Sequence, residues 1–363
     1  MNSKIREFNE CLTPGNAQWL ASMIEYKNRL LDHSVKKIYF IHGTFVGNDA
    51  LGFIGFLNPF FKHIKKGEEI SNSLKKMTKA SKNLIYEDFG NFNSTFLDLA
   101  RNTFEKDIPI EHFIWSSGNY HFARLQAAID LLFSIEKSVI KMCNQENSRI
   151  LFYNHSHAGQ LLAIITLLLE NKKTANGIFE IINKLPEMNL DKIKKALNSI
   201  RKIKLDIVNF GTPIRYKWGI TENYRLLSIV NYRSPIKISG LSNNRDGDYI
   251  RHYGTSGTDL LPPIGIKKIN DVLDNYLDKG RSISTTLKKL KKTTVDIPIN
   301  TENTPTGTLR LIDYKDNFVN PQIFRKKLPP QALLGVKSKF GHGVYTTTSA
   351  LRFNFKIITE ELY

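Results

Sequence analysis

Residues 150–170 constrain the fold of this chain more than any other stretch. Residues 150–155 are mostly apolar and have the length of a strand buried in a sheet. Residues 160–170 are also apolar and have the length of a helix. Ser156 stands between them, flanked by two histidines, and the small residues Ala158 and Gly159 that follow permit a tight turn. The sequence therefore predicts a buried strand, a sharp turn that carries a serine, and a helix.

This turn has the composition of a nucleophile elbow. In that motif the serine hydroxyl faces the substrate, and the next backbone N–H faces the oxyanion that develops during reaction. The usual pattern is G-x-S-x-G, whereas Asn154 and Ala158 occupy the two glycine positions here. Alanine is a mild change, and asparagine accepts unusual backbone angles better than most residues. A serine at this place can also be an ordinary helix N-cap, so other segments have to decide.

A second predicted strand, residues 36–41, runs into the sequence His42-Gly43-Thr44. Together with the elbow, this loop resembles the H-G oxyanion loop of α/β-hydrolases. The resemblance implies that the backbone N–H groups of Thr44 and His157 form the oxyanion hole. His42 is expected to brace the loop.

The resemblance covers roughly residues 36–350. The Gly-Thr-Pro sequence at residues 211–213 is often seen in lipases at the end of the strand that follows the elbow helix. Alternating strands and helices with short turns predict an α/β fold, with a mostly parallel central sheet and helices on both faces. The resemblance narrows this to the α/β-hydrolase fold. The further segments expected are strands at 110–115, 205–210, 226–232 and 308–314 and a helix at 119–140.

The resemblance also implies a catalytic triad in the chain order nucleophile, acid, histidine. His342 follows the last predicted strand, where the histidine belongs. Gly341 and Gly343 flank it and let the backbone bring the ring close to Ser156. His342 is therefore predicted to be the general base that deprotonates Ser156 and later protonates the leaving group.

The acid of the triad has three candidates. Related hydrolases often carry aspartate where Ser234 stands, and the loop after it offers Asp246, Asp248 and Asp259. We favour Asp248, because a Gly-Asp-Tyr step can present a carboxylate from a tight turn and Tyr249 can shield it from water. Asp246 and Asp259 remain alternatives, and all three can instead stabilise turns through bonds to the backbone.

The histidines around the elbow do not have the spacing of a metal site. No Asp, Glu or Cys stands at a ligand-like distance from His155 and His157, and zinc-binding histidine pairs on helices are usually four residues apart. We expect no metal and no organic cofactor. Both side chains are expected to line the pocket floor and to tie the oxyanion loop to the elbow.

The length permits a single catalytic domain over residues 1–363. Residues 56–107 are interpreted as an insertion and a candidate lid, residues 172–204 as a helical insertion and a candidate cap, and residues 262–300 as a basic connecting segment. The apolar residues 50–61 are expected to be either a buried helix or a wall for an acyl chain. They are too short to span a bilayer, which needs about 20 residues.

The chain has 52 Lys and Arg against 34 Asp and Glu, a net charge of +18. Such an excess attracts anionic surfaces, so peripheral contact with an anionic membrane is one expectation. Specific nucleic-acid binding is not expected, because the sequence has no helix-turn-helix, zinc-finger or RRM-type motif.

Only Cys11 and Cys143 are present, so a disulfide framework is not indicated. The sequence contains neither an apolar signal-like segment at its start nor a transmembrane stretch. A cytoplasmic location is the default expectation, and signal-independent export into another cell or compartment stays open.

These features predict a serine hydrolase that cleaves carboxylic esters through an acyl-enzyme, with lipase or phospholipase activity as one form. Two alternatives stay open. An acyltransferase would use the same Ser-His machinery with an alcohol or amine acceptor in place of water. A catalytically inactive hydrolase-like binding protein is favoured by Asn154 and by Ser234.

Overall fold

The protein is described here by a computed structural model. The residues that the structure describes are 6–43, 92–141, 147–213, 215–232, 247–248, 251, 262, 264–278, 307–315 and 341–363. Within them, seven strands form one parallel sheet in the order β1-β7-β6-β5-β4-β2-β3. The strands are β1 (Arg6–Glu7), β2 (Val35–Ile41), β3 (Ile110–Phe113), β4 (Arg149–His155), β5 (Lys204–Phe210), β6 (Tyr224–Asn231) and β7 (Gly307–Asp313).

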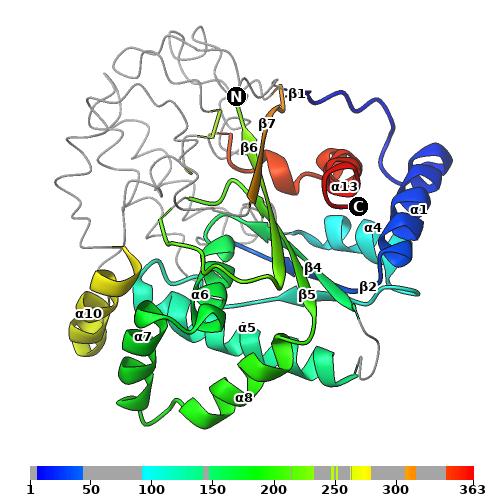
Figure 1. Cartoon of the computed structure of the whole chain (residues 1–363). Coiled ribbons are helices and arrows are strands. Elements are labelled where there is room, and N and C mark those ends of the chain that lie inside the picture. Colours follow the sequence, from blue (N-terminus) through cyan, green and yellow to red (C-terminus); the bar gives the residue numbers. More distant parts are fainter. Residues whose placement is uncertain are drawn as a thin grey trace, which may run out of the picture.

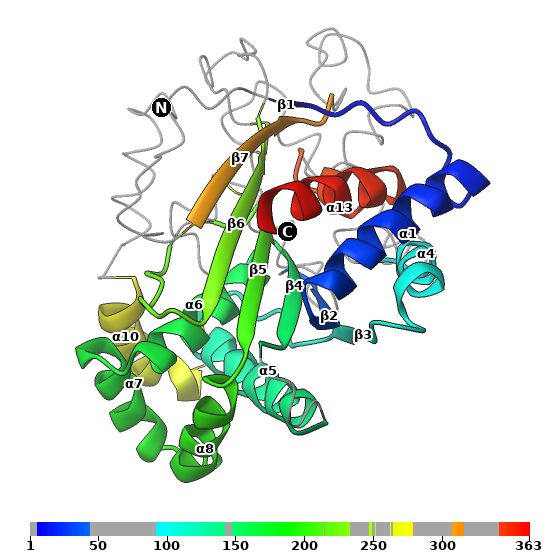
Figure 2. The ribbon, with the colours of Figure 1, turned by 45° about the vertical axis from the view of Figure 1, so that its right-hand side comes forward.

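Helices cover both faces of this sheet, as Figures 1 and 2 show. One face carries α1 (Ala17–Asp32), α4 (Ser94–Phe104) and α13 (Thr348–Leu362). The other face carries α5 (His121–Lys141), α6 (Ala158–Glu170), α7 (Lys173–Asn183), α8 (Leu190–Ile200) and α10 (Lys267–Leu277). Two short 3₁₀ helices, η1 (Ile264–Ile266) and η5 (Val344–Thr346), complete the described elements. The predicted α/β class is confirmed.

Strand β4 shows why the apolar run of the sequence is continuous. Ile150 and Phe152 belong to the core under α5 and α6, whereas Leu151 and Tyr153 belong to the core under α1, α4 and α13. Successive side chains of a strand point to opposite faces of the sheet. A strand with a core on each face therefore needs an apolar residue at every position, which is the pattern that residues 150–153 have.

The order of the strands reverses direction at β2. The chain passes from β2 to β3 on one side and then returns to form β4 on the other side of β2. In parallel sheets, ligands bind outside the carboxyl ends of the strands at such a reversal point. His42 and Gly43 follow β2, and Ser156 follows β4, so the residues of the predicted oxyanion loop and elbow flank this point.

The predicted insertions have different outcomes. Residues 94–104 of the candidate lid at 56–107 form α4, and Phe96 and Phe104 of this helix are fully buried against α1 and α13. This part of the predicted 56–107 insertion is a constituent of the helix layer, because its apolar face completes a core. Residues 56–91 of that range lie outside the described residues, as do residues 50–55 of the apolar segment.

The other two predicted segments contain helices that pack on the same face of the sheet. Residues 172–204 form α7 and α8, which contact α6 and α5 respectively. Residues 264–277 of the predicted basic segment form η1 and α10, and α10 contacts α5 and α7. Among the described helices, none has the length and apolar character needed to cross a membrane.

Candidate active site

Ser156 lies at a strained turn between β4 and α6. Its φ angle is 57°, in the left-handed region that residues other than glycine rarely adopt. Such a conformation costs about 1–3 kcal/mol and persists only where the surroundings hold it. Here the N–H of Ser156 donates to the carbonyl oxygen of Phe210 at 2.9 Å, and the Thr212 hydroxyl donates to the carbonyl oxygen of Ser156 at 2.8 Å. The end of β5 therefore fixes the turn.

The two departures from G-x-S-x-G have a structural explanation. Asn154 is the penultimate residue of β4 and is not among the described residues with positive φ, so its backbone does not require glycine. Its side-chain amide donates to Asn209 Oδ1 on the neighbouring strand at 3.2 Å. The close approach occurs at Gly159 instead, where a Cβ atom would lie 2.5 Å from Thr212 Oγ1.

His342 and Asp248 form a buried pair. Nδ1 of His342 lies 2.8 Å from each carboxylate oxygen of Asp248. A nitrogen that faces a carboxylate in this way carries the proton, which leaves Nε2 of the neutral ring as the acceptor. Gly341, at φ 81°, allows this meeting, because a Cβ atom there would lie only 1.8 Å from the carbonyl oxygen of Gly247.

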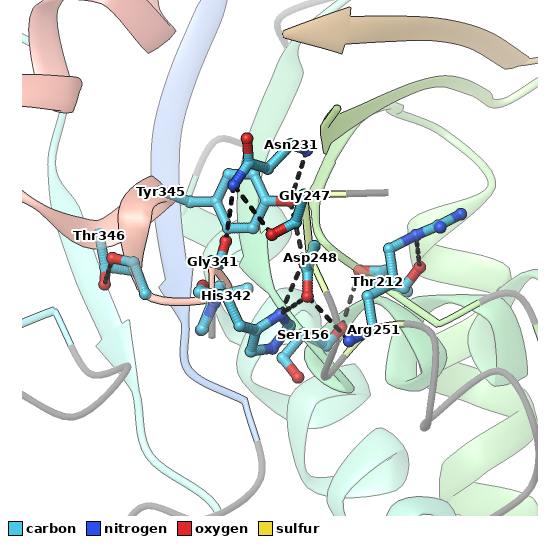
Figure 3. A network of polar contacts seen from close by, with 12 residues as sticks. Ser156, Thr212, Asn231, Gly247, Asp248, Arg251, Gly341, His342, Tyr345 and Thr346 are labelled. Carbon is cyan, nitrogen blue, oxygen red and sulfur yellow. Dashed lines mark hydrogen bonds and ion pairs between the residues drawn. The ribbon is translucent and has the colours of Figure 1, made fainter. Parts of the chain in front are cut away.

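Several contacts bring Ser156 to the same place as this pair. In Figure 3 its side chain lies beside the imidazole of His342. The ring of the preceding residue, His155, has its centroid 4.6 Å from that of His342. Gly211 directly follows Phe210, whose carbonyl oxygen accepts from the Ser156 N–H. A Cβ atom on Gly211 would lie 2.5 Å from Asp248 Oδ2 and 3.1 Å from His342 Nδ1. The predicted nucleophile, base and favoured acid therefore lie at one edge of the sheet.

The other predicted candidates for the acid and the oxyanion hole are not described. Asp246, Asp259 and Thr44 lie outside the described residues, as does Tyr249, the expected shield of Asp248. Ser234, at the position where related hydrolases often carry the acid, lies outside them as well.

The loop after β2 approaches the elbow closely. A Cβ atom on Gly43 would lie 2.5 Å from Ser156 Cβ and 3.1 Å from Ser156 Oγ, so any larger residue would displace the serine. His157 is the N-cap residue of α6 and directly follows Ser156. Its N–H therefore lies at the positive end of the helix dipole, where negative charge is stabilised.

His42 braces this loop, as expected. The backbone N–H of Trp115 donates to His42 Nε2 at 3.2 Å, and the indole N–H of Trp115 donates to the carbonyl oxygen of His42 at 2.8 Å. Because Nε2 accepts, the proton is on Nδ1, which donates to the carbonyl oxygen of Gly43 at 2.8 Å. Both ring nitrogens of His42 are thus used to hold backbone.

His155 has a partner that the sequence analysis did not predict. Its Nε2 lies 2.9 Å from the carbonyl oxygen of His342. His155 therefore joins the elbow to the loop that carries the base. The two loops are 187 residues apart in the sequence, which is why the pattern around residue 155 could not show this partner. The expected tie to the oxyanion loop stays a prediction, because that loop continues outside the described residues.

Two residues of the site were missed by the sequence analysis. The Tyr345 hydroxyl donates to Asp248 Oδ2 at 2.8 Å and accepts from the backbone N–H of Asn231 at 2.7 Å. The backbone N–H of Arg251 donates to the other carboxylate oxygen at 2.8 Å. Two signals were available, and the first is the position of Tyr345 only three residues after His342. Asn231 is a second signal, as a polar residue at the end of an apolar strand.

One group of possible metal ligands occurs among the described residues. Ligand atoms of His121, Asp274 and Asp278 lie within 4.8 Å of one another. Arg215 forms an ion pair with Asp278, and His121 Nε2 lies 3.0 Å from Asp274 Oδ1. The arginine supplies positive charge where a metal would have to, so this group is best understood as a polar network that joins α10 to α5.

Comparisons of the chain with protein-family models, with curated proteins and with solved structures each find no match. Likeness to a known protein therefore assigns no activity here. An activity has to be inferred from the arrangement of Ser156, His342 and Asp248.

Proposed function

We propose that the protein is a serine hydrolase with an α/β-hydrolase fold, which cleaves carboxylic esters through an acyl-enzyme. Ser156 is the nucleophile, His342 the general base and acid, and Asp248 the carboxylate that orients the imidazole. The observation that carries the proposal is the buried contact of His342 Nδ1 with both oxygens of Asp248, beside a serine at φ 57°.

The positions of these residues on the sheet support the same proposal. Ser156 follows β4, Asp248 follows β6 and His342 follows β7, the last strand described. This is the order nucleophile, acid, histidine, with the acid after the penultimate strand, that is typical of α/β-hydrolases. A pair of loops that merely packed together would not need a strained serine next to them.

In the first step, Ser156 Oγ attacks the ester carbonyl while His342 Nε2 accepts its proton. Asp248 stabilises the imidazolium that forms but does not itself take up the proton. The N–H of His157 binds the oxygen that becomes negative, and Thr44 is the expected second donor. His342 then donates the proton to the leaving alcohol, and the serine remains acylated.

In the second step, His342 deprotonates a water molecule, which attacks the acyl carbonyl. The bond to Ser156 Oγ then breaks, His342 returns the proton to this oxygen, and the carboxylic acid is released. Lipid and phospholipid esters are the substrates to test first. The charge of +18 favours anionic interfaces, where such substrates are found.

Covalent labelling with a fluorophosphonate tests the nucleophile. The wild type and the control variant Ser199→Ala, on helix α8, are expected to form an adduct, whereas Ser156→Ala is not. Peptide mapping should place the adduct on Ser156. An adduct that survives Ser156→Ala would remove the assignment, and a folded wild type without any adduct would favour the inactive binding protein.

Product analysis then separates hydrolysis from acyl transfer. Unlabelled enzyme from the same preparation is supplied with a p-nitrophenyl ester or a phosphatidylglycerol vesicle, with and without glycerol as acceptor. Hydrolysis releases free fatty acid at a rate that the acceptor leaves unchanged. Conversion of most of the acyl group to acylglycerol would identify a transferase.

A further inference from the structure

The hydroxyl of Tyr345 is a fully buried group in direct contact with the proposed catalytic acid. It donates to Asp248 Oδ2 at 2.8 Å and accepts from the N–H of Asn231 at 2.7 Å. Figure 3 shows the ring between Asn231 and Asp248. Because the Asn231 amide supplies the proton on one side, the phenol proton is directed at the carboxylate.

Asn231 also fixes the backbone of both loops that meet here. Its carbonyl oxygen accepts from the N–H of Gly247 at 2.9 Å. Its side-chain amide donates to the carbonyl oxygen of Gly341 at 3.0 Å and lies 3.4 Å from that of Gly247. The residues that precede the acid and the base in the chain are therefore both attached to the last residue of β6.

We propose that Tyr345 is a positioning residue that holds the Asp248 carboxylate in the orientation His342 requires. The inference rests on the proposed function of these two residues. Each oxygen of Asp248 lies 2.8 Å from His342 Nδ1, and among the described residues Tyr345 also donates to Oδ2 and the Arg251 N–H to Oδ1. With both oxygens held, rotation of the carboxylate would break at least one bond.

The phenol also affects the charge that His342 senses. A hydrogen bond to a carboxylate stabilises its negative charge and withdraws part of it from other partners. Without the phenol proton, more of this charge is available to the imidazolium, while the carboxylate is oriented less well. Loss of the hydroxyl should therefore change both the rate and its pH dependence.

The test is Tyr345→Phe, which removes the hydroxyl and keeps the ring. We expect kcat for a soluble ester to fall about 10-fold with KM unchanged, less than the ~100-fold that a 1 Å misplacement of a reacting group costs. The acid limb of the kcat/KM profile should move to higher pH. The low-field proton resonance of His342 Nδ1–H should also move, and this signal is read without substrate.

Tyr314→Phe is the matched control. Its ring centroid lies 5.3 Å from that of Tyr345, and its buried hydroxyl donates to Asn354 Oδ1 at 2.7 Å, away from the acid. This variant should lose a comparable amount of stability in thermal unfolding. Its pH profile and its His342 proton resonance should stay as in the wild type.

The outcomes separate the two proposals. If the wild type labels at Ser156 but Tyr345→Phe matches Tyr314→Phe in rate, pH profile and resonance, the role of Tyr345 is overturned and the proposed function stands. If the wild type does not label at all, the proposed function fails and the role of Tyr345 falls with it. A shift of the profile and of the resonance in Tyr345→Phe alone supports the role.

Discussion

Asp206 and Asp248 are both fully buried, one at the amino ends and the other at the carboxyl ends of the strands, and the two carboxylates have different partners. Asp206 is near the amino end of β5, where Arg149 contacts both oxygens at 2.7 and 2.8 Å and Arg225 contacts one at 2.9 Å. Asp248 follows β6 at the carboxyl edge and contacts an imidazole, a phenol and a backbone N–H. One carboxylate is held by permanent charges and the other faces a group that can change its charge.

The partners decide what each carboxylate can do. Burial alone would raise the pKa of Asp206, but the hydrogen bonds from Arg149 and Arg225 outweigh burial and lower the pKa below its ordinary value. Arginine stays charged at any ordinary pH, so Asp206 has a constant role in stability. Histidine is the one side-chain type that ordinarily changes its charge near neutrality, so in the proposed mechanism His342 transfers the proton and Asp248 stabilises the resulting charge.

The largest effect is expected for Asp248→Asn. The asparagine keeps the shape but stabilises the wrong tautomer of His342 and no imidazolium, so kcat should fall by about 10⁴-fold. The melting temperature should change little. Steady-state kinetics with thermal unfolding of the same sample measures both. Unchanged turnover would pass the role of the acid to Asp246 or Asp259.

Asp206→Asn should show the opposite result, a loss of stability with kcat unchanged. It leaves Arg149 and Arg225 without their common partner, and breaking a buried ion pair costs about 3 kcal/mol of unfolding free energy. The fraction that stays folded should keep the wild-type kcat. For this comparison, the concentration of active sites is measured by fluorophosphonate labelling of Ser156 in a separate aliquot. Asp107→Asn, which breaks the exposed pair with Lys27, is the control and should leave the unfolding free energy nearly unchanged.

Acidification of the wild type should reproduce part of this loss. The pKa of Asp206 is lower in the folded chain than its ordinary value of 3.8, so its contribution to stability is present above that pH. The contribution is lost as the pH falls through the lower, folded value. Urea unfolding at several pH values should give a shallower acid dependence for Asp206→Asn than for the wild type. Equal slopes would show that Asp206 is not the group responsible.

Gly211→Ala tests whether the carboxyl edge depends on close packing. Gly211 has φ 60°, and the added Cβ atom would approach Asp248 Oδ2 to 2.5 Å and Tyr345 Cε2 to 2.6 Å. A displacement of the acid by about 1 Å should reduce kcat about 100-fold. Gly265→Ala is the matched control, because a Cβ atom there meets nothing within 4 Å. Similar rates for the two variants would show that the edge can relax.

The smallest effect is expected at the amino edge for Tyr363→Phe. The Tyr363 hydroxyl donates to Asp206 Oδ2 at 2.6 Å, and burial is the main reason why the pKa of this phenol is raised well above its ordinary value. Loss of one such bond should cost about 1 kcal/mol in chemical unfolding, with kcat unchanged. A change in kcat would mean that the two edges are coupled.

The elements of the fold could be predicted where the sequence pattern is local. The strand at residues 150–155 and the turn at Ser156 follow from a continuous apolar run that meets small residues. Residues 92–107 were included in the candidate lid of residues 56–107, and that interpretation gave no weight to the apolar spacing of α4. Phe96 and Phe104 are core residues because α1 and α13 pack against them, a contact that the local sequence does not show.

The sequence by itself determined the α/β class and where along the chain a serine and a histidine could react, because strand length, apolar runs and glycine-flanked turns are local properties. Only the tertiary structure decided which carboxylate meets His342, since Asp248 is 94 residues away from it. The same holds for the buried partners of each carboxylate. Such contacts depend on which loops the sheet brings to one edge, and strand order is set by packing over the whole chain.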